Sequence, residues 1–154
     1  MRRIATVALA TGVALAGLGA EATTADAATH KWNTAKSGFS NIYASGSYTR
    51  TTKSVSVSGY LRDYAPDGRS PGVQFKAVKI TKTYIYTQRS NQFFFISSKT
   101  GKPLDYKFPK AYSYGHFFTS KYLTHLYVRE ISVNASNRQD TYPKNVKTGW
   151  KKIY

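Results

Sequence analysis

The sequence contains no cysteine and few acidic residues. Its 154 residues include 7 aspartates and glutamates, 3 histidines and one methionine. The absence of cysteine excludes disulfides, thiolate catalysis and thiolate metal sites. The shortage of acids and histidines leaves few groups for proton transfer. The fold must therefore be held by packing alone, and the available chemistry is mainly that of basic and aromatic side chains.

The chain also lacks a hydrophobic run that would make a convincing membrane anchor. The apolar run of residues 4–20 is rich in alanine and glycine, and it is short against the ~20 strongly apolar residues of a spanning helix. It follows Arg2 and Arg3 and precedes Ala25-Asp26-Ala27, which is the order of a secretory signal peptide cleaved after Ala27. We therefore expect a signal peptide over residues 1–27 and one secreted, extracellular domain over residues 28–154. The two arginines leave the general secretory and the twin-arginine export routes open.

Basic and aromatic residues are abundant instead. There are 23 lysines and arginines, and the net charge is +16 at pH 7. The predicted leader holds two bases and two acids, so its removal leaves this charge unchanged. All 13 tyrosines, 8 phenylalanines and 2 tryptophans follow residue 27, and each buried ring removes a large area from water. We expect an aromatic core inside a strongly positive surface.

Polar and apolar residues alternate along most of the chain after residue 28, and no helical recurrence at three and four is sustained. In residues 54–62, for example, Val55, Val57 and Leu61 share one face. This alternation predicts an all-β protein. We expect a single antiparallel β-sandwich, immunoglobulin-like or jelly-roll-like, of about seven to nine strands. The expected strands lie within residues 38–51, 54–62, 72–80, 83–88, 92–97, 112–120, 123–134 and 148–154.

Two irregularities are predicted within these strands. The apolar phase in residues 72–80 changes from Phe75 and Ala77 to Val78 and Ile80, which predicts a β-bulge near Ala77. The runs 83–88 and 92–97 are separated by Arg89-Ser90-Asn91, a spacing typical of a hairpin.

Asp63 and Asp67 lie four residues apart in a stretch of turn residues, LRDYAPDGRS. Proline, aspartate and glycine in this order favour a turn. The stretch lacks the alternating oxygen ligands and terminal glutamate of a calcium loop. We interpret Asp63 as the end of a strand and the following residues, up to Gly72, as a connection rather than a metal or catalytic site.

The stretch VSVSGYLRDYAPDGRSPGVQF, followed about fifty residues later by HLYVREISV, resembles small secreted β-sandwich proteins common in actinomycete genomes. In those proteins a V-x-G strand leads through an Asp-rich turn to a second strand, and a late strand alternates apolar and arginine residues. The resemblance covers most of residues 39–153. It implies the fold and export but no activity, because most of those proteins have none assigned. They often carry paired cysteines, which this chain lacks.

The candidate acids and bases form no local catalytic or metal motif. His125 and Glu130 are five residues apart, so a strand places them on opposite faces. We expect His30 to lie in a disordered terminus, and His116 to be partly buried and hydrogen-bonded to the backbone. The histidine spacing matches no zinc motif, and no G-x-S-x-G elbow is present. We assign no catalytic residue, no metal and no cofactor.

Tyrosines beside cations are the binding candidates. Such rings can stack on sugars or bases, although tyrosines also pack across strands. The net charge of +16 attracts anionic polymers through counterion release. The expected partners are an anionic cell-wall polymer, an acidic polysaccharide or extracellular nucleic acid. The candidate binding residues are Tyr84, Tyr86, Arg89, Lys110, Tyr112 and Tyr114.

The favoured hypothesis is a secreted, non-enzymatic, strongly basic β-sandwich that binds an anionic polymer or glycan at the cell surface. One alternative is a small basic secreted hydrolase, ribonuclease- or glycosidase-like, that uses His116 or His125 with Glu130. Another is a secreted inhibitor or antagonist that acts through a loop such as residues 66–71. The charge could also serve solubility alone.

Overall fold

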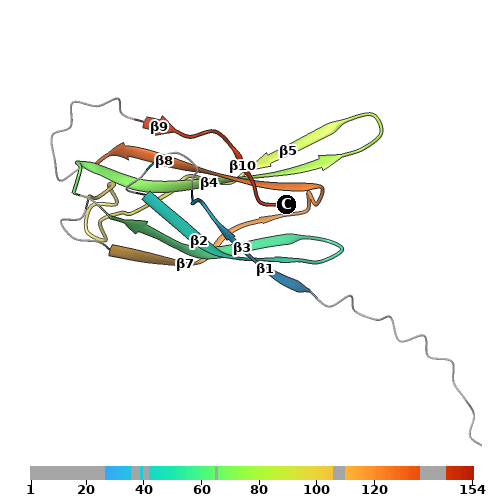
Figure 1. Cartoon of the computed structure of the whole chain (residues 1–154), viewed down its shortest axis with the longest axis horizontal. Helices are drawn as coiled ribbons and strands as arrows, with labels where there is room; N and C mark the ends of the chain where they lie inside the picture. The colour runs from blue at the N-terminus through green and yellow to red at the C-terminus, as the bar shows by residue number, and fades with distance from the viewer. Residues whose placement is uncertain (1–26, 36–38, 40–41, 65, 106–109, 136–144) are drawn as a thin grey trace, which may run out of the picture.

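Two antiparallel sheets packed face to face make up the described part of the chain (Figure 1). The computed structural model describes residues 27–35, 39, 42–64, 66–105, 110–135 and 145–154. The side chains of residues 110, 112, 145 and 146 are outside this description, as is nearly all of the predicted signal peptide. No helix occurs in the described residues, and none there could cross a membrane. The predicted all-β class and the β-sandwich are confirmed.

One sheet has four strands and the other has six. The four-stranded sheet has the order β1-β2-β3-β7. Its strands are β1 (Ala28–Asn33), β2 (Ile42–Arg50), β3 (Val55–Asp63) and β7 (Lys110–Ser120). The six-stranded sheet has the order β10-β8-β4-β5, and in it β6 also pairs with β4 and β9 with β8. Its strands are β4 (Arg69–Ile80), β5 (Ile85–Arg89), β6 (Phe93–Phe94), β8 (His125–Asn134), β9 (Asn145–Lys147) and β10 (Lys151–Lys152).

Phe75 of β4 joins the two sheets. Its ring contacts Trp32 of β1 at 5.1 Å between centroids, Phe117 of β7 at 5.3 Å and Phe118 at 6.5 Å. All four rings are buried. The aromatic core expected from the composition therefore lies between the sheets, with aliphatic side chains around it.

The first strand lies where the sequence predicted disorder. β1 pairs with β2 along its whole length. The ring of His30 stacks on Tyr48 at 5.1 Å, and the indole Nε1 of Trp32 donates to the carbonyl oxygens of Ser47 and Ser58. The prediction for His30 is wrong because a buried tryptophan two residues later anchors the strand.

The predicted bulge near Ala77 is also wrong. The β4–β8 register runs unbroken from the Arg69–Asn134 pair to the Val78–His125 pair. The apolar phase changes because Val78, on the side of β4 opposite Phe75, is also buried, whereas Ile80 lies beyond the end of β8 at an exposed position.

The irregularity of the sandwich lies in β7 instead. Val57 of β3 pairs with Phe118 and Gly59 pairs with Tyr114, so three residues of β7 stand opposite one residue of β3. This bulge lets the adjacent Phe117 and Phe118 both reach the core.

β5 and β6 do not form the predicted hairpin. Both pair with β4, β5 along residues 76–80 and β6 along residues 72–73. Ser90, between them, donates its N–H to the carbonyl of Phe75 and accepts the Phe75 N–H on its hydroxyl oxygen. The two segments are thus one interrupted strand along a single edge of β4.

The turn interpretation of Asp67 is confirmed. Its Oδ1 accepts the backbone N–H of Arg69 at 3.0 Å, Gly68 has a φ of 84°, and Asp63 is the last residue of β3. The Gly68 N–H also donates to Asp105 at 2.9 Å, which fixes the turn from a distant loop.

The connection after β3 is shorter than predicted. β4 begins at Arg69, so Ser70 and Pro71 lie in a strand and are buried. The loop of residues 66–71 that an inhibitor would present is therefore reduced to the residues before Arg69.

Candidate functional site

Three cations and two aromatic rings gather on the outer side of the six-stranded sheet. Lys76 comes from β4, Arg89 from β5, Tyr127 and Arg129 from β8, and Trp150 from the segment before β10. We call these five residues the cation–aromatic face. Lys76 pairs with Arg89 on one side and with Tyr127 on the other, so the three form one row across the sheet. Lys76 lies between the core residues Phe75 and Ala77, so its side chain points away from the core.

The two rings contact two of the three cations, Lys76 and Arg129. The Lys76 Nζ lies 4.4 Å from the ring centroid of Tyr127 and 4.7 Å from that of Trp150. The Arg129 Cζ lies 4.4 Å from the ring centroid of Trp150. Trp150 therefore contacts two cations at distances at which cation–π attraction is significant.

A buried amide orients Arg129. Its Nε and Nη2 donate to Gln74 Oε1 at 3.1 and 2.6 Å. The Gln74 Nε2 in turn donates to the carbonyl oxygen of Ser90 at 2.9 Å. Because an amide oxygen is neutral, these bonds fix the guanidinium without cancelling its charge.

The cations of this face repel one another. Burial, followed by the positive charges of Arg89 and Arg129, lowers the pKa of Lys76. Burial and the charge of Arg89 also lower the pKa of Arg129. Glu130 pairs with the core residue Val73 and so lies on the other face of β8. The remaining described acids, which lie in β3 or at the Gly68 turn, are Asp63, Asp67 and Asp105. No described carboxylate side chain neutralises the face, so a bound anion would relieve the repulsion.

Two further lysines extend the face. Lys152 of β10 pairs with Tyr127, and Lys147 of β9 pairs with Ile131, which lies on the same side of β8 as Arg129. Both lysines are exposed. Positive charge thus continues to the far edge of the sheet.

The candidate binding residues from the sequence do not gather in one place. Among those with described side chains, Arg89 lies on the cation–aromatic face. Tyr86 pairs with Lys79, and it is three residues from Arg89, so the two lie on opposite sides of β5. Tyr84, 6.1 Å from the Tyr86 ring, is exposed at the hairpin.

The other three candidates belong to β7 of the other sheet. Tyr114 packs against Phe117 and Phe93, with centroids 4.8 and 5.5 Å away, and its hydroxyl donates to the Phe94 carbonyl. It serves the core. The backbones of Lys110 and Tyr112 pair with the end of β3, and their side chains lie outside the described set.

Four residues of the face escaped the sequence analysis, namely Lys76, Tyr127, Arg129 and Trp150. Lys76 and Arg129 do occupy outward positions of two predicted strands, which is a detectable signal. Their meeting depends on the pairing of β4 with β8, and alternation along one strand carries no information on that pairing.

The histidines do not join the acids. His125 pairs with Val78 and Glu130 with Val73, so the expectation that the two occupy opposite faces of β8 is confirmed. His116 is exposed, with its nitrogens 3.5 Å from Ser56 Oγ and 3.4 Å from Thr119 Oγ1. The prediction of a partly buried ring bonded to the backbone is therefore wrong. Within the described ranges, no three potential metal ligands cluster.

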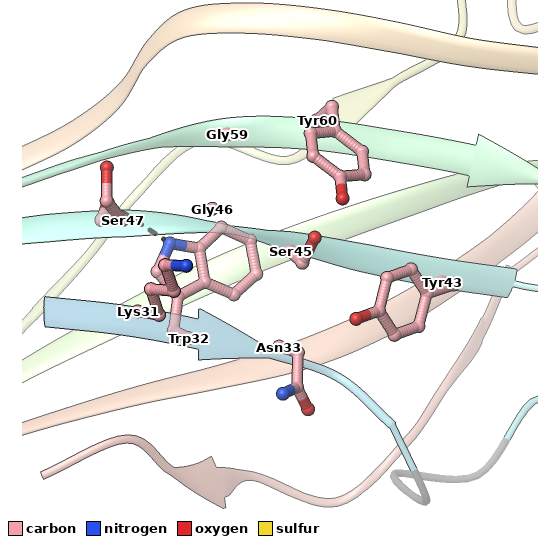
Figure 2. Close-up of a pocket in the computed structure, with 9 residues that line it drawn as sticks. All are labelled: Lys31, Trp32, Asn33, Tyr43, Ser45, Gly46, Ser47, Gly59 and Tyr60. Carbon is pink, nitrogen blue, oxygen red and sulfur yellow. Dashed lines mark hydrogen bonds between the residues drawn. The ribbon is translucent and has the colours of Figure 1, made fainter.

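A groove of about 400 Å³ lies on the four-stranded sheet, over β1, β2 and β3 (Figure 2). Figure 2 shows two tyrosine rings beside small polar side chains. At the groove β2 and β3 approach so closely that a Cβ on Gly46 would lie 2.0 Å from the Ser58 carbonyl oxygen. The lining residues are Lys31, Trp32, Asn33, Tyr43, Ser45, Gly46, Ser47, Gly59 and Tyr60. Hydroxyls, an amide and one lysine suit a polar ligand better than a polyanion.

No protein-family model, curated protein or solved structure matches this chain.

Proposed function

We propose that the protein is a secreted, non-enzymatic β-sandwich that binds an anionic polymer through the cation–aromatic face. The observation that carries the proposal is the grouping of Lys76, Arg89 and Arg129. Rings and a neutral amide hold Lys76 and Arg129 in place, and each has a lowered pKa beside like charges. A site of this kind gains electrostatic energy when anionic groups enter it.

A polymer fits this face better than a small anion. The row from Arg89 through Lys76 and Tyr127 to Lys152 crosses four adjacent strands, a span of roughly 14 Å at the usual ~4.8 Å between strands. Charges repeated along a chain can contact such a row at several points, whereas one small anion contacts one. The half-buried rings of Tyr127 and Trp150 add surfaces for sugars or bases. Acidic polysaccharides, anionic wall polymers and nucleic acids share this chemistry.

The start of the fold supports export. β1 begins at Ala28, directly after the predicted cleavage position, so removal of residues 1–27 would leave every described strand intact. The chain has no cysteine, so its fold does not depend on a free thiol. An exported protein of this charge meets anionic polymers outside the cell.

The test is binding of fluorescent heparin and duplex DNA to the purified protein over a range of salt concentrations. We expect affinity to fall steeply as salt rises. Replacing both Lys76 and Arg129 with glutamine should weaken binding about tenfold or more, because two positioned contacts are lost. The matched control is the double variant Lys53→Gln, Lys99→Gln, which removes two exposed charges from loops outside the face.

Three results would contradict the proposal. Equal losses in the two double variants would mean that charge alone, without a site, is responsible. If the protein binds a neutral oligosaccharide independently of salt and Tyr60→Ala abolishes this binding, the ligand site is the groove on the four-stranded sheet. Hydrolysis of RNA or a glycan that is lost in His125→Ala would favour the enzyme alternative.

A further inference from the structure

The β4–β5 hairpin carries most of the exposed apolar side chains in the described residues. Four of the six exposed large hydrophobic residues lie on it, and Ile85 and Tyr84 are 71% and 63% exposed. The four are Ile80, Tyr84, Ile85 and Tyr86; the other two are Tyr64 and Ile96. Such a concentration marks an interaction site.

The hairpin projects beyond the sandwich (Figure 1). Pairing of β4 with β8 ends at the Val78–His125 pair, and β5 pairs with β4 alone. The turn is ordered by Thr81, whose hydroxyl oxygen accepts the Tyr84 N–H at 2.9 Å and whose N–H donates to the Tyr84 carbonyl at 2.9 Å. The apolar side chains thus stand on an extension whose turn is closed by hydrogen bonds.

Both sides of the hairpin are apolar. Ile80 pairs with Ile85 on one side. Tyr86 lies on the other, with the Tyr84 ring 6.1 Å away. A single flat protein surface would cover only one of these sides, whereas the interfacial region of a bilayer can surround both.

Lysines flank the exposed rings and isoleucines. Lys79 and Lys82 are exposed on the hairpin itself, and Lys121 is exposed next to Tyr122, whose ring lies 6.2 Å from that of Tyr86. Residues 76–89 contain no acid. This charge attracts anionic lipid and repels a second copy of a protein of net charge +16.

We propose that the β4–β5 hairpin docks into the interfacial region of an anionic lipid bilayer. Ile80 and Ile85 enter below the headgroups, the tyrosine rings lie at headgroup depth, and the lysines contact lipid phosphates. The hairpin lies at the interface and does not span the bilayer. This site is additional to the cation–aromatic face and does not depend on it.

The first experiment is co-sedimentation with vesicles of phosphatidylcholine, with and without phosphatidylglycerol. We expect binding only when phosphatidylglycerol is present. Ile85→Ser should weaken it at least tenfold, which corresponds to about 1.4 kcal/mol. The matched control is Ile96→Ser, which removes an exposed isoleucine outside the hairpin and should leave vesicle binding unchanged.

The second experiment reports insertion directly. Because the chain has no cysteine, Thr83→Cys supplies a unique attachment point for an environment-sensitive dye at the turn. We expect a blue shift of the dye on addition of phosphatidylglycerol vesicles. The same dye at Lys53→Cys, in the turn between β2 and β3, should show none.

Several outcomes would overturn the proposal: equal vesicle binding by Ile85→Ser and the parent, a dye at residue 83 that stays in water, or self-association lost in Ile85→Ser without vesicle binding. The last would identify a second copy as the occupant. Failure here is distinguishable from failure of polymer binding, because Ile85→Ser should still bind heparin while the Lys76 and Arg129 double variant should still shift the dye at residue 83.

Discussion

The buried hydroxyl of Tyr154 should make the stability of the fold depend on pH. Its ring packs against Tyr48 at 5.0 Å and lies 5.1 Å from the guanidinium of Arg50. The hydroxyl is buried and has no hydrogen-bond partner in the described part of the chain. Burial raises the pKa of the Tyr154 phenol, because the charged phenolate is poorly solvated there.

Replacing Tyr154 with phenylalanine should leave the free energy of unfolding at pH 7 unchanged or raise it by about 1 kcal/mol, since an unpaired buried hydroxyl is removed. At higher pH the gain should grow. The unfolded tyrosine loses its proton near pH ~10 while the folded one keeps it, so the parent loses stability as pH rises from there through the raised folded pKa. Urea unfolding between pH 7 and pH 11 measures the difference.

Tyr84→Phe is the control, because its hydroxyl belongs to an exposed side chain. This variant should follow the parent across the whole pH range. A loss above about 1 kcal/mol in Tyr154→Phe at pH 7 would mean that the hydroxyl has a partner.

At the scale of elements, β4 organises the six-stranded sheet. It pairs with β8 on one side and with β5 and β6 on the other. Between β5 and β6 the side chain of Ser90 takes the place of a ladder carbonyl and accepts the N–H of Phe75. The interruption therefore leaves no unpaired donor at the most buried part of the strand.

Ser90→Ala should lower the free energy of unfolding by about 1–3 kcal/mol, because the buried Phe75 N–H loses its acceptor. Ser113→Ala, at an exposed position in β7, should change it by no more than about 0.5 kcal/mol. Urea denaturation of both variants makes the comparison, and equal effects would show that water replaces the Ser90 hydroxyl.

Most of the strands were predictable, but their pairing was not. Alternation located the strands around Val55 and Phe75 because each places apolar side chains in the core at every second position, and the turn at Asp67 followed from its own residue types. The hairpin predicted around Ser90 was wrong because both flanking runs pair with β4, β5 across the short turn at residues 81–84 and β6 with residues 72–73. β1 was missed because its stability comes from Trp32 packing against other strands.

The same contrast between strand formation and strand pairing applies to the candidate site. Arg89 was singled out for its neighbouring tyrosines, which in fact belong to the other side of the hairpin. Its neighbours on the face are Lys76 of β4 and Arg129 of β8, and only the strand order brings them together. The sequence indicated that cations and aromatic rings are abundant, but it did not indicate which of them lie together in the fold.

At the scale of the whole molecule, a few rings hold two sheets that no disulfide connects. Phe75 contacts rings of β1 and β7 from the opposite sheet and is fully buried. Because the chain has no cysteine, loss of this packing has no covalent compensation.

Phe75→Ala should cost about 3–5 kcal/mol, a large part of the ~5–15 kcal/mol that stabilises a typical domain. Phe75→Leu, with less volume lost, should cost less and remain folded for measurement. Tyr84→Ala, which removes an exposed ring, should cost about 0.5 kcal/mol or less. Urea unfolding monitored by both near- and far-ultraviolet circular dichroism makes the measurement. A Phe75→Ala variant as stable as Tyr84→Ala would contradict the packing described above.

The position of β4 affects how the protein would attach to a cell surface, because this strand belongs to both proposed binding sites. Lys76 and Ile80 lie on the same side of this one strand, four residues apart, which is roughly 13 Å. A polymer at Lys76 would therefore hold the hairpin close to any bilayer to which that polymer is anchored, and the second contact would form at a high effective concentration. The two attachments would then act with avidity, and the protein would be retained longer where polymer and lipid coincide than where either occurs alone.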